Sequence, residues 1–232
     1  VGNMQTPGFT TTAALGDVAP AGQASVGLFS GFTNLLAGST TRVLYLRLFP
    51  EGLFVPETSQ LSKVRNTEGF VFSDDIADTL TLEIYSAVHP YPLLTKIHGL
   101  SLRTDGHVHS VIPSDLPSEG YLAIRHRNSI ETWTSNSVSF NMEVIYWDFT
   151  TSSGMAFGNS QKEINGWFCI FSGDTNQDGM INQDDINNIT TKSSEFLKGY
   201  MVEDINGDGL ADATDIILTD NNSALSIIVI RP

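Results

Sequence analysis

A twelve-residue pattern near the C-terminus occurs twice, 30 residues apart, and it constrains the fold more than any other feature of the sequence. The first copy runs from Asp174 to Asp185 and the second from Asp204 to Asp215. In both copies Asp stands at positions 1, 5 and 12, Asn at position 3 and Gly at position 6. Because the two copies match in register, we expect the chain to form two equivalent loops.

The oxygen-bearing residues of each copy stand where a calcium ion needs ligands. Ca²⁺ takes about six to eight oxygens, and an EF-hand-type loop supplies them from positions 1, 3, 5, 7, 9 and 12, with Gly at 6 for the sharp turn. In the first loop the predicted ligands are Asp174, Asn176, Asp178, the Met180 carbonyl, Asn182 through water, and Asp185. In the second they are Asp204, Asn206, Asp208, the Leu210 carbonyl, Asp212 and Asp215. The sequence therefore predicts two bound Ca²⁺ ions.

The residues around the loops differ from those of a helix–loop–helix EF-hand. Gly166–Ser172, before the first loop, reads as a strand, and position 12 is Asp instead of Glu. A duplicated loop of this kind, with Asp at position 12 followed by Ile186 or Ile216, resembles the dockerin type I module over about residues 173–222. The resemblance implies a small α/loop module of double EF-hand type and a bacterial origin.

The same resemblance implies a docking role. Dockerins of this type bind cohesin modules through the helix that follows each loop, and loop positions 10 and 11 set their specificity. Here these positions hold Gln183 and Asp184 in the first copy, and Ala213 and Thr214 in the second. Because the two pairs differ, a near-symmetric docking surface that works in two orientations is not expected.

Residues before the loops alternate as strands do. In Thr41–Leu48 the side chains of Leu44, Leu46 and Leu48 fall on one face. Further strands are predicted at Asp78–Tyr85, Lys96–Arg103, His107–Ile112, Gly120–Trp133 and Ser137–Val144, and a loop at Leu53–Gly69. We predict a mainly β chain, in which an Ig-like antiparallel β-sandwich at residues 41–165 precedes the dockerin-like module at 166–232. Its inward side chains should include Leu44, Leu46, Leu82, Ile84 and Ile124.

The two ends of the chain are too apolar to be free tails. Residues 1–40 carry a long apolar series, and we predict an arm that adds a strand either to its own sandwich or to a neighbouring copy. The second arrangement would propagate as a filament. Ile227–Ile230, at the other end, should pack beside the strand at Trp167–Ile170 and clamp the module to the sandwich.

Charge and composition exclude some functions. The net charge is −14, and residues 173–232 hold 11 Asp and Glu against 3 Lys and Arg, which argues against nucleic-acid partners. No apolar run approaches the length of about 18 residues that a membrane span needs. Cys169 is alone within an apolar segment and is expected to be buried.

The expected location is extracellular or at the cell surface. Val1–Met4 show neither the basic region nor the apolar core of a signal peptide, so we expect a mature secreted chain. Calcium loops of weak to moderate affinity are useful mainly where calcium is millimolar. Tyr121–Phe140, with Tyr146–Phe149 and Gly158–Gln161, is also similar to the C-terminal region of Bacteroidetes-type secreted surface proteins.

Other polar residues offer further candidate sites. Arg125–Asn128 fits a glycan or carboxylate site, or an arginine pair that bridges acidic side chains at a domain junction. His107 and His109 share one strand face, as a metal pair could, but no third ligand is apparent. No catalytic motif is present, and Glu83, Glu131 and Glu143 stand at positions expected to face solvent, so no enzymatic activity is predicted.

Three hypotheses of function remain open. The first is an extracellular calcium-binding structural protein that assembles with copies of itself or with the cell surface. The second is a docking module with a cohesin partner. The third is carbohydrate binding through Trp133, Tyr146 or Trp147.

Overall fold

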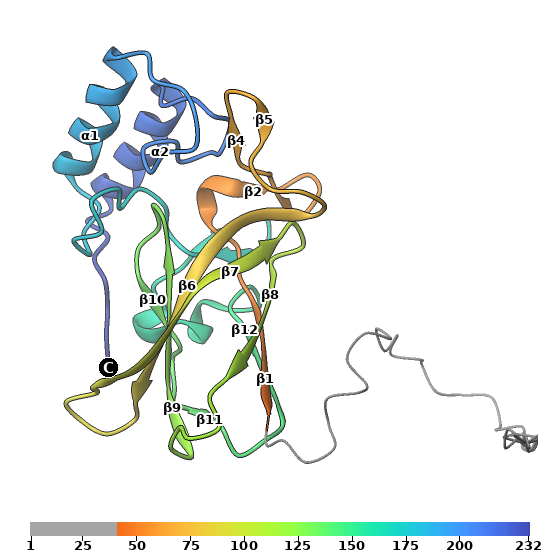
Figure 1. The fold of residues 1–232 in the computed structure, drawn as a ribbon. Coiled ribbons are helices and arrows are strands. Elements are labelled where there is room, and N and C mark those ends of the chain that lie inside the picture. Colours follow the sequence, from red (N-terminus) through yellow and green to blue (C-terminus); the bar gives the residue numbers. More distant parts are fainter. Residues whose placement is uncertain (1–40) are drawn as a thin grey trace, which may run out of the picture. The chain divides into compact units, whose positions relative to one another are not determined.

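The computed structural model describes residues 41–232, in which β-strands predominate and two α-helices lie near the C-terminus (Figure 1). The longer strands are β1 (Arg42–Arg47), β6 (Ile76–Ser86), β7 (Leu93–Arg103), β8 (His107–Ile112), β9 (Glu119–His126) and β12 (Val144–Asp148). The short strands are β2 (Phe54–Val55), β3 (Gln60–Leu61), β4 (Arg65–Asn66), β5 (Gly69–Phe70), β10 (Thr132–Trp133), β11 (Val138–Ser139), β13 (Lys162–Ile164) and β14 (Trp167–Cys169). The helices are α1 (Gln183–Ser194) and α2 (Ala213–Ala224), with single 3₁₀ turns η1 (Glu51–Leu53), η2 (Ser153–Met155) and η3 (Phe157–Asn159).

Two main sheets hold the longer strands. One has five strands, all antiparallel, in the order β10-β9-β6-β7 with β11 also paired to β9. The other has three strands in the order β12-β1-β8, and here β1 runs antiparallel to β8 but parallel to β12. The prediction of an antiparallel β-sandwich is therefore wrong at this pair. Parallel neighbours need a long connection, and the chain between β1 and β12 supplies it.

The two sheets share one hydrophobic core. Leu44 and Leu46 from β1 are 0% and 1% exposed, and Leu82, Ile84 and Ile124 from the five-stranded sheet are all 0% exposed. The period-two alternation of these strands placed the inward side chains correctly. Cys169 belongs to the same core, and burial raises the pKa of its thiol to about 12. The prediction of a buried cysteine is confirmed.

The segment from Leu53 to Gly69 was expected to be a loop, and this prediction is wrong in part. It contains β2 and β3, paired with each other, and β4, which pairs with β5. Each of these strands is two residues long, which is too short for an alternating pattern to appear in the sequence.

The C-terminal segment is packed, but not beside the strand that leads into the first loop. That strand, β14, pairs with β13, whereas the Ile181 N–H donates to the Ile227 carbonyl at 2.9 Å and the Val229 N–H to the Gly179 carbonyl at 2.8 Å. The Ile227 and Val229 side chains pack on a small cluster formed by Ile130, Phe171 and Ile181. The expected pairing with the strand at Trp167–Ile170 is therefore wrong. Ile227 and Val229 bury their side chains on this apolar cluster, which places them beside the first loop.

Residues 1–40, and with them the predicted strand-donating arm, lie outside the described part of the chain. The division at residues 41–165 and 166–232 also stays a prediction. Among residues 41–232, neither α1 nor α2 is long and apolar enough to cross a membrane.

Candidate metal centre

The two candidate loops fold alike around their first residue. In the first loop the Asp174 carboxylate accepts a hydrogen bond from the Gly179 N–H at 3.2 Å, and in the second Asp204 accepts one from the Gly209 N–H at 3.0 Å. The two glycines have φ values of 88° and 89°, in the left-handed region that favours glycine. Position 6 therefore turns the chain back so that its N–H reaches position 1 in both loops.

The last carboxylate closes each loop on the same partners. Asp185 Oδ1 accepts from the N–H groups of positions 2 and 3 at 2.8 and 3.3 Å, and Asp215 Oδ1 does so at 2.8 and 3.1 Å. The other oxygen of each carboxylate accepts from the N–H of position 9, at 3.0 Å from Asn182 and 2.9 Å from Asp212. Position 12 thus ties the start of each loop to its end.

Asn and Asp at positions 3 and 5 shape the middle of each loop. The Asn176 side-chain oxygen accepts from the Asp178 N–H at 2.9 Å, and Asp178 accepts from the Met180 N–H at 2.9 Å. Asn206 and Asp208 make the corresponding bonds at 2.8 and 2.9 Å. In each of these turns an Asn or Asp side chain accepts a hydrogen bond from the backbone two residues further on, which fixes the local backbone conformation.

A helix begins directly after position 9 in each loop. Asn182 caps α1 and Asp212 caps α2, and each forms a capping box with the position-12 Asp. Neither loop directly follows an α-helix, since the first comes after β14 and a segment of turns separates α1 from the second. Each unit is thus a loop followed by a helix, repeated at the 30-residue spacing.

The loop carboxylates that are buried stand in an unfavourable electrostatic setting. Asp174, Asp185, Asp204 and Asp215 are at most 1% exposed. Burial, and then the charge of Asp185, raises the pKa of Asp174 to about 7. Burial raises the pKa of Asp204 to about 6, although Arg127 acts in the opposite direction, and burial also raises that of Asp215.

One buried oxygen also lacks any protein partner. Asp174 Oδ1 makes no hydrogen bond, although Oδ2 of the same carboxylate accepts from Gly179. A buried carboxylate oxygen without a partner is costly, and hard oxygens of this kind suit a calcium ion. The residues of the first loop therefore fit the predicted ion.

Within residues 41–232 no three His, Cys, Asp or Glu side chains are placed to hold a metal ion by themselves. Loops of the EF-hand type also use side-chain amides, a backbone carbonyl and water. The predicted shells in fact include Asn176, Asn206, and the carbonyls of Met180 and Leu210.

Residues that follow β9 hold both loops. The Asn128 side chain donates to the carbonyls of Val202 and Asp204 at 3.1 and 2.9 Å, and the backbone carbonyl of Asn128 accepts from the Gly173 N–H at 2.7 Å. The Gln177 side chain of the first loop donates to the Ser129 carbonyl at 3.2 Å. This role was not predicted for Asn128, because the partners are distant in sequence.

A buried charge cluster also connects the five-stranded sheet to the second loop. Arg127 donates to the Asp78 carboxylate at 2.8 Å and to the Asp204 carbonyl at 2.5 Å. Asp78 also bonds His126 at 3.1 Å and the Tyr200 hydroxyl at 2.7 Å. Of the two readings of Arg125–Asn128, the bridge at a junction agrees with these contacts.

Near its C-terminal end, α2 contacts the residues that follow β1 and those that follow β14. Asn222 on α2 is 0% exposed, and it donates to Glu51 at 2.6 Å and to the Ser172 carbonyl at 2.8 Å. Lys162 forms an ion pair with Glu51 and donates to Asn222 at 3.2 Å. In the sequence, the contact is indicated only by a polar residue, Asn222, at a position of α2 that faces inward.

Two of the three glutamates expected to face solvent are buried. Glu83 is 1% exposed and bonds Lys96 at 2.6 Å and Arg125 at 3.1 Å. Glu131 is 3% exposed and pairs with both Arg125 and Arg231. The prediction is wrong because long cationic side chains cover this face of the sheet. Glu143 is exposed as expected.

The remaining candidates do not form one site. The ring centroids of His107 and His109 lie 6.4 Å apart, and His107 pairs with Asp105. Trp133 is 3% exposed and Trp147 packs against the core, whereas Tyr146 is 72% exposed. The three aromatic residues predicted for carbohydrate binding therefore do not share a surface.

Comparisons with known proteins leave the family open. No protein-family model matches the chain, and no curated protein matches it significantly. Two crystal structures of type II cohesin–X-dockerin complexes from Acetivibrio cellulolyticus, one a C-terminal and one an N-terminal interface mutant, are similar to it. In each case the identity is 16% and the TM-score 0.44, over 78% of this chain and 94% of the other.

Proposed function

We propose that the chain is a non-catalytic extracellular structural protein that binds two calcium ions. In this proposal an Ig-like β-sandwich carries a dockerin-like module at residues 166–232. The observation that supports it best is the repetition of one hydrogen-bond pattern in two loops, with buried carboxylates at positions 1 and 12 of each. The unpartnered Asp174 Oδ1 adds an acceptor that a cation would satisfy.

The residues of each loop would supply the ligands of the ion. Positions 1, 3, 5 and 12 would contribute side-chain oxygens, position 7 its carbonyl, and position 9 an oxygen through water. A bound Ca²⁺ would supply the positive charge that offsets repulsion among the carboxylates. Since the loops are bonded to Asn128 and Ser129, ion binding would also stiffen the junction with the β-sheets.

Calcium titration of the intact chain tests this proposal. Calorimetry should show two sites, and chelation should lower the melting temperature and expose residues 173–222 to proteolysis first. Asp185→Ala should remove one site, whereas Asp220→Ala, an exposed Asp on α2, should leave both. A chain that takes up no calcium, or whose stability ignores chelation, would contradict it.

The proposal also includes the assembly of copies of this chain with one another. Residues 1–40 would add a strand to the sheet edge of a neighbouring copy, for which β7, β8 and β12 offer edges among the described strands. Deleting residues 1–22 should then give a folded, calcium-binding monomer from a chain that otherwise assembles. An intact chain that stays monomeric at high concentration would contradict it.

Docking to a cohesin-type partner is the second candidate. The observation in its favour is that Gln183, Asp184, Ala213 and Thr214, at loop positions 10 and 11, are all exposed on the first turns of α1 and α2. A pull-down against purified cohesin modules, with and without calcium, separates this candidate from self-assembly.

A further inference from the structure

Three polar side chains from η1, β13 and α2 meet at one point. They are Glu51, Lys162 and Asn222, which are far apart in the sequence. Lys162 Nζ donates to Glu51 Oε1 and, at 3.2 Å, to Asn222 Oδ1. Asn222 Nδ2 donates to Glu51 Oε2 at 2.6 Å. Each of the three residues therefore contacts the other two, and we call them the Lys–Asn–Glu cluster.

Further hydrogen bonds fix the orientation of the Asn222 amide. Its Nδ2 also donates to the Ser172 carbonyl at 2.8 Å, and the Ser172 N–H donates to Glu51 Oε2 at 3.3 Å. Nδ2 thus has an acceptor for each of its two hydrogens, and Oδ1 accepts from Lys162. This orientation places the Lys162 nitrogen beside the carbonyl of the amide and Nδ2 beside the carboxylate.

The cluster lies in a mostly buried setting. Glu51 is 7% exposed and Asn222 is 0% exposed. Lys162 stands opposite Cys169 in register, and the Glu51 N–H donates to the Ile170 carbonyl at 3.0 Å, where both Cys169 and Ile170 are 0% exposed. Of the three side chains, that of Lys162 is the most open to solvent, at 32%. Such a setting limits attack by water on the groups that it holds.

The repeated loop-and-helix unit does not itself require an Asn at position 222. The equivalent residue of the first copy, 30 positions earlier, is Lys192, which is partly exposed and forms an ion pair with Glu195 at 3.3 Å. The two helices are otherwise alike, since each is 12 residues long and begins with a capping box. Asn222 is therefore explained by its contacts with Glu51 and Lys162.

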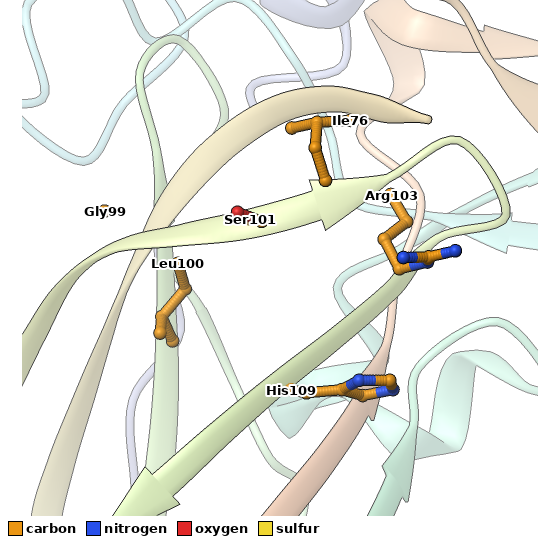
Figure 2. A pocket seen from close by; sticks show the side chains of 6 residues that line it. All are labelled: Ile76, Gly99, Leu100, Ser101, Arg103 and His109. Carbon is orange, nitrogen blue, oxygen red and sulfur yellow. The ribbon is translucent and has the colours of Figure 1, made fainter. Parts of the chain in front are cut away.

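The polar groups of the cluster bond mainly with one another. A ligand at this point would have to displace these hydrogen bonds, whereas a reaction among the three side chains needs no additional group. The cavity of about 390 Å³ in Figure 2 is lined by other residues, among them Arg103 and His109, and shares none with the cluster. The chemistry available here is therefore that of an amine, a carboxamide and a carboxylate held together.

We propose that Lys162 and Asn222 become joined by an isopeptide bond, with Glu51 as the group that moves the protons. The two oxygens of Glu51 lie one on each reacting nitrogen, Oε1 at Nζ and Oε2 at Nδ2. A carboxylate in this position accepts a proton from the attacking amine and delivers one to the departing nitrogen. Since the fold holds all three groups, the reaction is intramolecular and gains from their proximity.

The reaction exchanges one amide for another. Glu51 takes a proton from Lys162 Nζ, and the freed electron pair attacks Asn222 Cγ to form a C–N bond. The carbonyl is re-formed as the bond between Cγ and Nδ2 breaks. Glu51 gives its proton to Nδ2 and takes the second proton from Nζ, so that Nδ2 leaves as ammonia and finally carries that proton away as ammonium. No oxidant, reductant or cofactor is needed.

The bond would close a ring that contains both predicted calcium loops. Lys162 precedes Asp174, and Asn222 follows Asp215. The cross-link would restrict the unfolded chain, as a disulfide does, and so stabilise the folded one. The inference goes beyond the proposed function and does not depend on it, because none of the three residues is a predicted calcium ligand.

Intact-mass spectrometry of the purified full chain tests the proposal. The wild type should be lighter than its sequence by one molecule of ammonia, about 17 Da. Lys162→Arg, Asn222→Ala and Glu51→Gln should each show the full mass of their own sequence. Lys198→Arg and Asn221→Ala, at exposed positions, are the matched controls and should keep the loss of ammonia.

Tryptic digestion identifies the two ends of the bond. Acylation protects Lys162 from trypsin, so residues 128–192 should appear as one peptide linked to residues 199–232. Loss of ammonia through ring closure of Asn222 on its own backbone would instead leave Lys162 cleavable and give no linked peptide. Circular dichroism melting, with calcium present, should show that Lys162→Arg is folded and melts at a lower temperature than Lys198→Arg.

Three results would overturn the bond. They are a wild type of full sequence mass, a loss of ammonia that persists in Lys162→Arg, and a loss of ammonia without the linked peptide. A linked peptide that still forms at the wild-type level in Glu51→Gln would overturn the role of Glu51. The wild-type mass and digest decide the main question even where a variant fails to fold.

Discussion

The side-chain amide of Asn128 donates to the backbone carbonyl of Asp204 at 2.9 Å, across 76 residues of sequence. Its second hydrogen bond, to the Val202 carbonyl, holds the chain just before the second loop. One side chain after β9 therefore fixes where that loop begins.

Replacing Asn128 by Ala should reduce the free energy of unfolding by about 1–3 kcal/mol, because it removes both of these hydrogen bonds and leaves Arg127 as the remaining donor to the Asp204 carbonyl. Urea unfolding with calcium present measures the change. Asn136→Ala, at an exposed position, is the matched control and should cost less than about 0.5 kcal/mol. Equal losses in the two variants would show that the junction does not depend on Asn128.

Position 9 should set the order of calcium affinity. The second loop has four carboxylates and the first has three, since Asp212 stands where the first loop has Asn182. Asp212→Asn should weaken the second site, and Asn182→Asp should strengthen the first, because ligand charge tunes affinity. Asn and Asp cap helices equally well, so the exchange leaves α1 and α2 intact. Calorimetric titration should show the two shifts in opposite directions.

Acid should weaken the fold through Asp78. Burial alone would raise the pKa of this carboxyl, but the hydrogen bond from His126 and the charges of His126 and Arg127 hold it well below its usual value. The ionised form therefore contributes stability above the unfolded pKa of about 4, and this contribution is lost as the pH falls below that value.

The comparison of wild type with Asp78→Asn isolates this effect. Chemical unfolding should show the variant to be less stable at pH 7, with the difference shrinking below about pH 4. Both proteins are measured in chelator, so that calcium release does not contribute. If the difference in unfolding free energy stays constant down to pH 2, the variant is destabilised by altered packing and not by loss of the Asp78 charge.

Leu46 should anchor the three-stranded sheet. It is 1% exposed in the shared core, and Leu46→Ala should cost about 2–5 kcal/mol in unfolding free energy. Val111→Ala, on the outer face of the same sheet, should cost well under 1 kcal/mol. Guanidinium unfolding of both variants tests whether the inner and outer faces are assigned correctly.

Local patterns predicted the parts of the fold that depend on near neighbours in sequence. Alternation over a few residues was enough to place Leu44 and Ile84 in the core, because successive side chains of a strand point to opposite faces. The loops could be located for a similar reason, since all their oxygens lie within twelve residues. Their occupancy by calcium stays a prediction.

Contacts between distant residues could not be predicted in the same way. Glu83 and Glu131 read as solvent-facing, yet each is buried under arginine or lysine side chains from other elements. The parallel pairing of β1 with β12 and the packing of Ile227 near Ile181 likewise join segments that share no local signal. Alternation gives the face of a strand but not the identity of what covers it.

The position of Ile227 and Val229 has a consequence for folding during synthesis. The second loop takes its outside partners, such as Arg127 and Asn128, from residues that the ribosome has already made. The first loop is bonded also to Ile227 and Val229, which follow both loops and α2 in the sequence. The loop that is translated first is therefore completed only after the second loop and α2 have been synthesised.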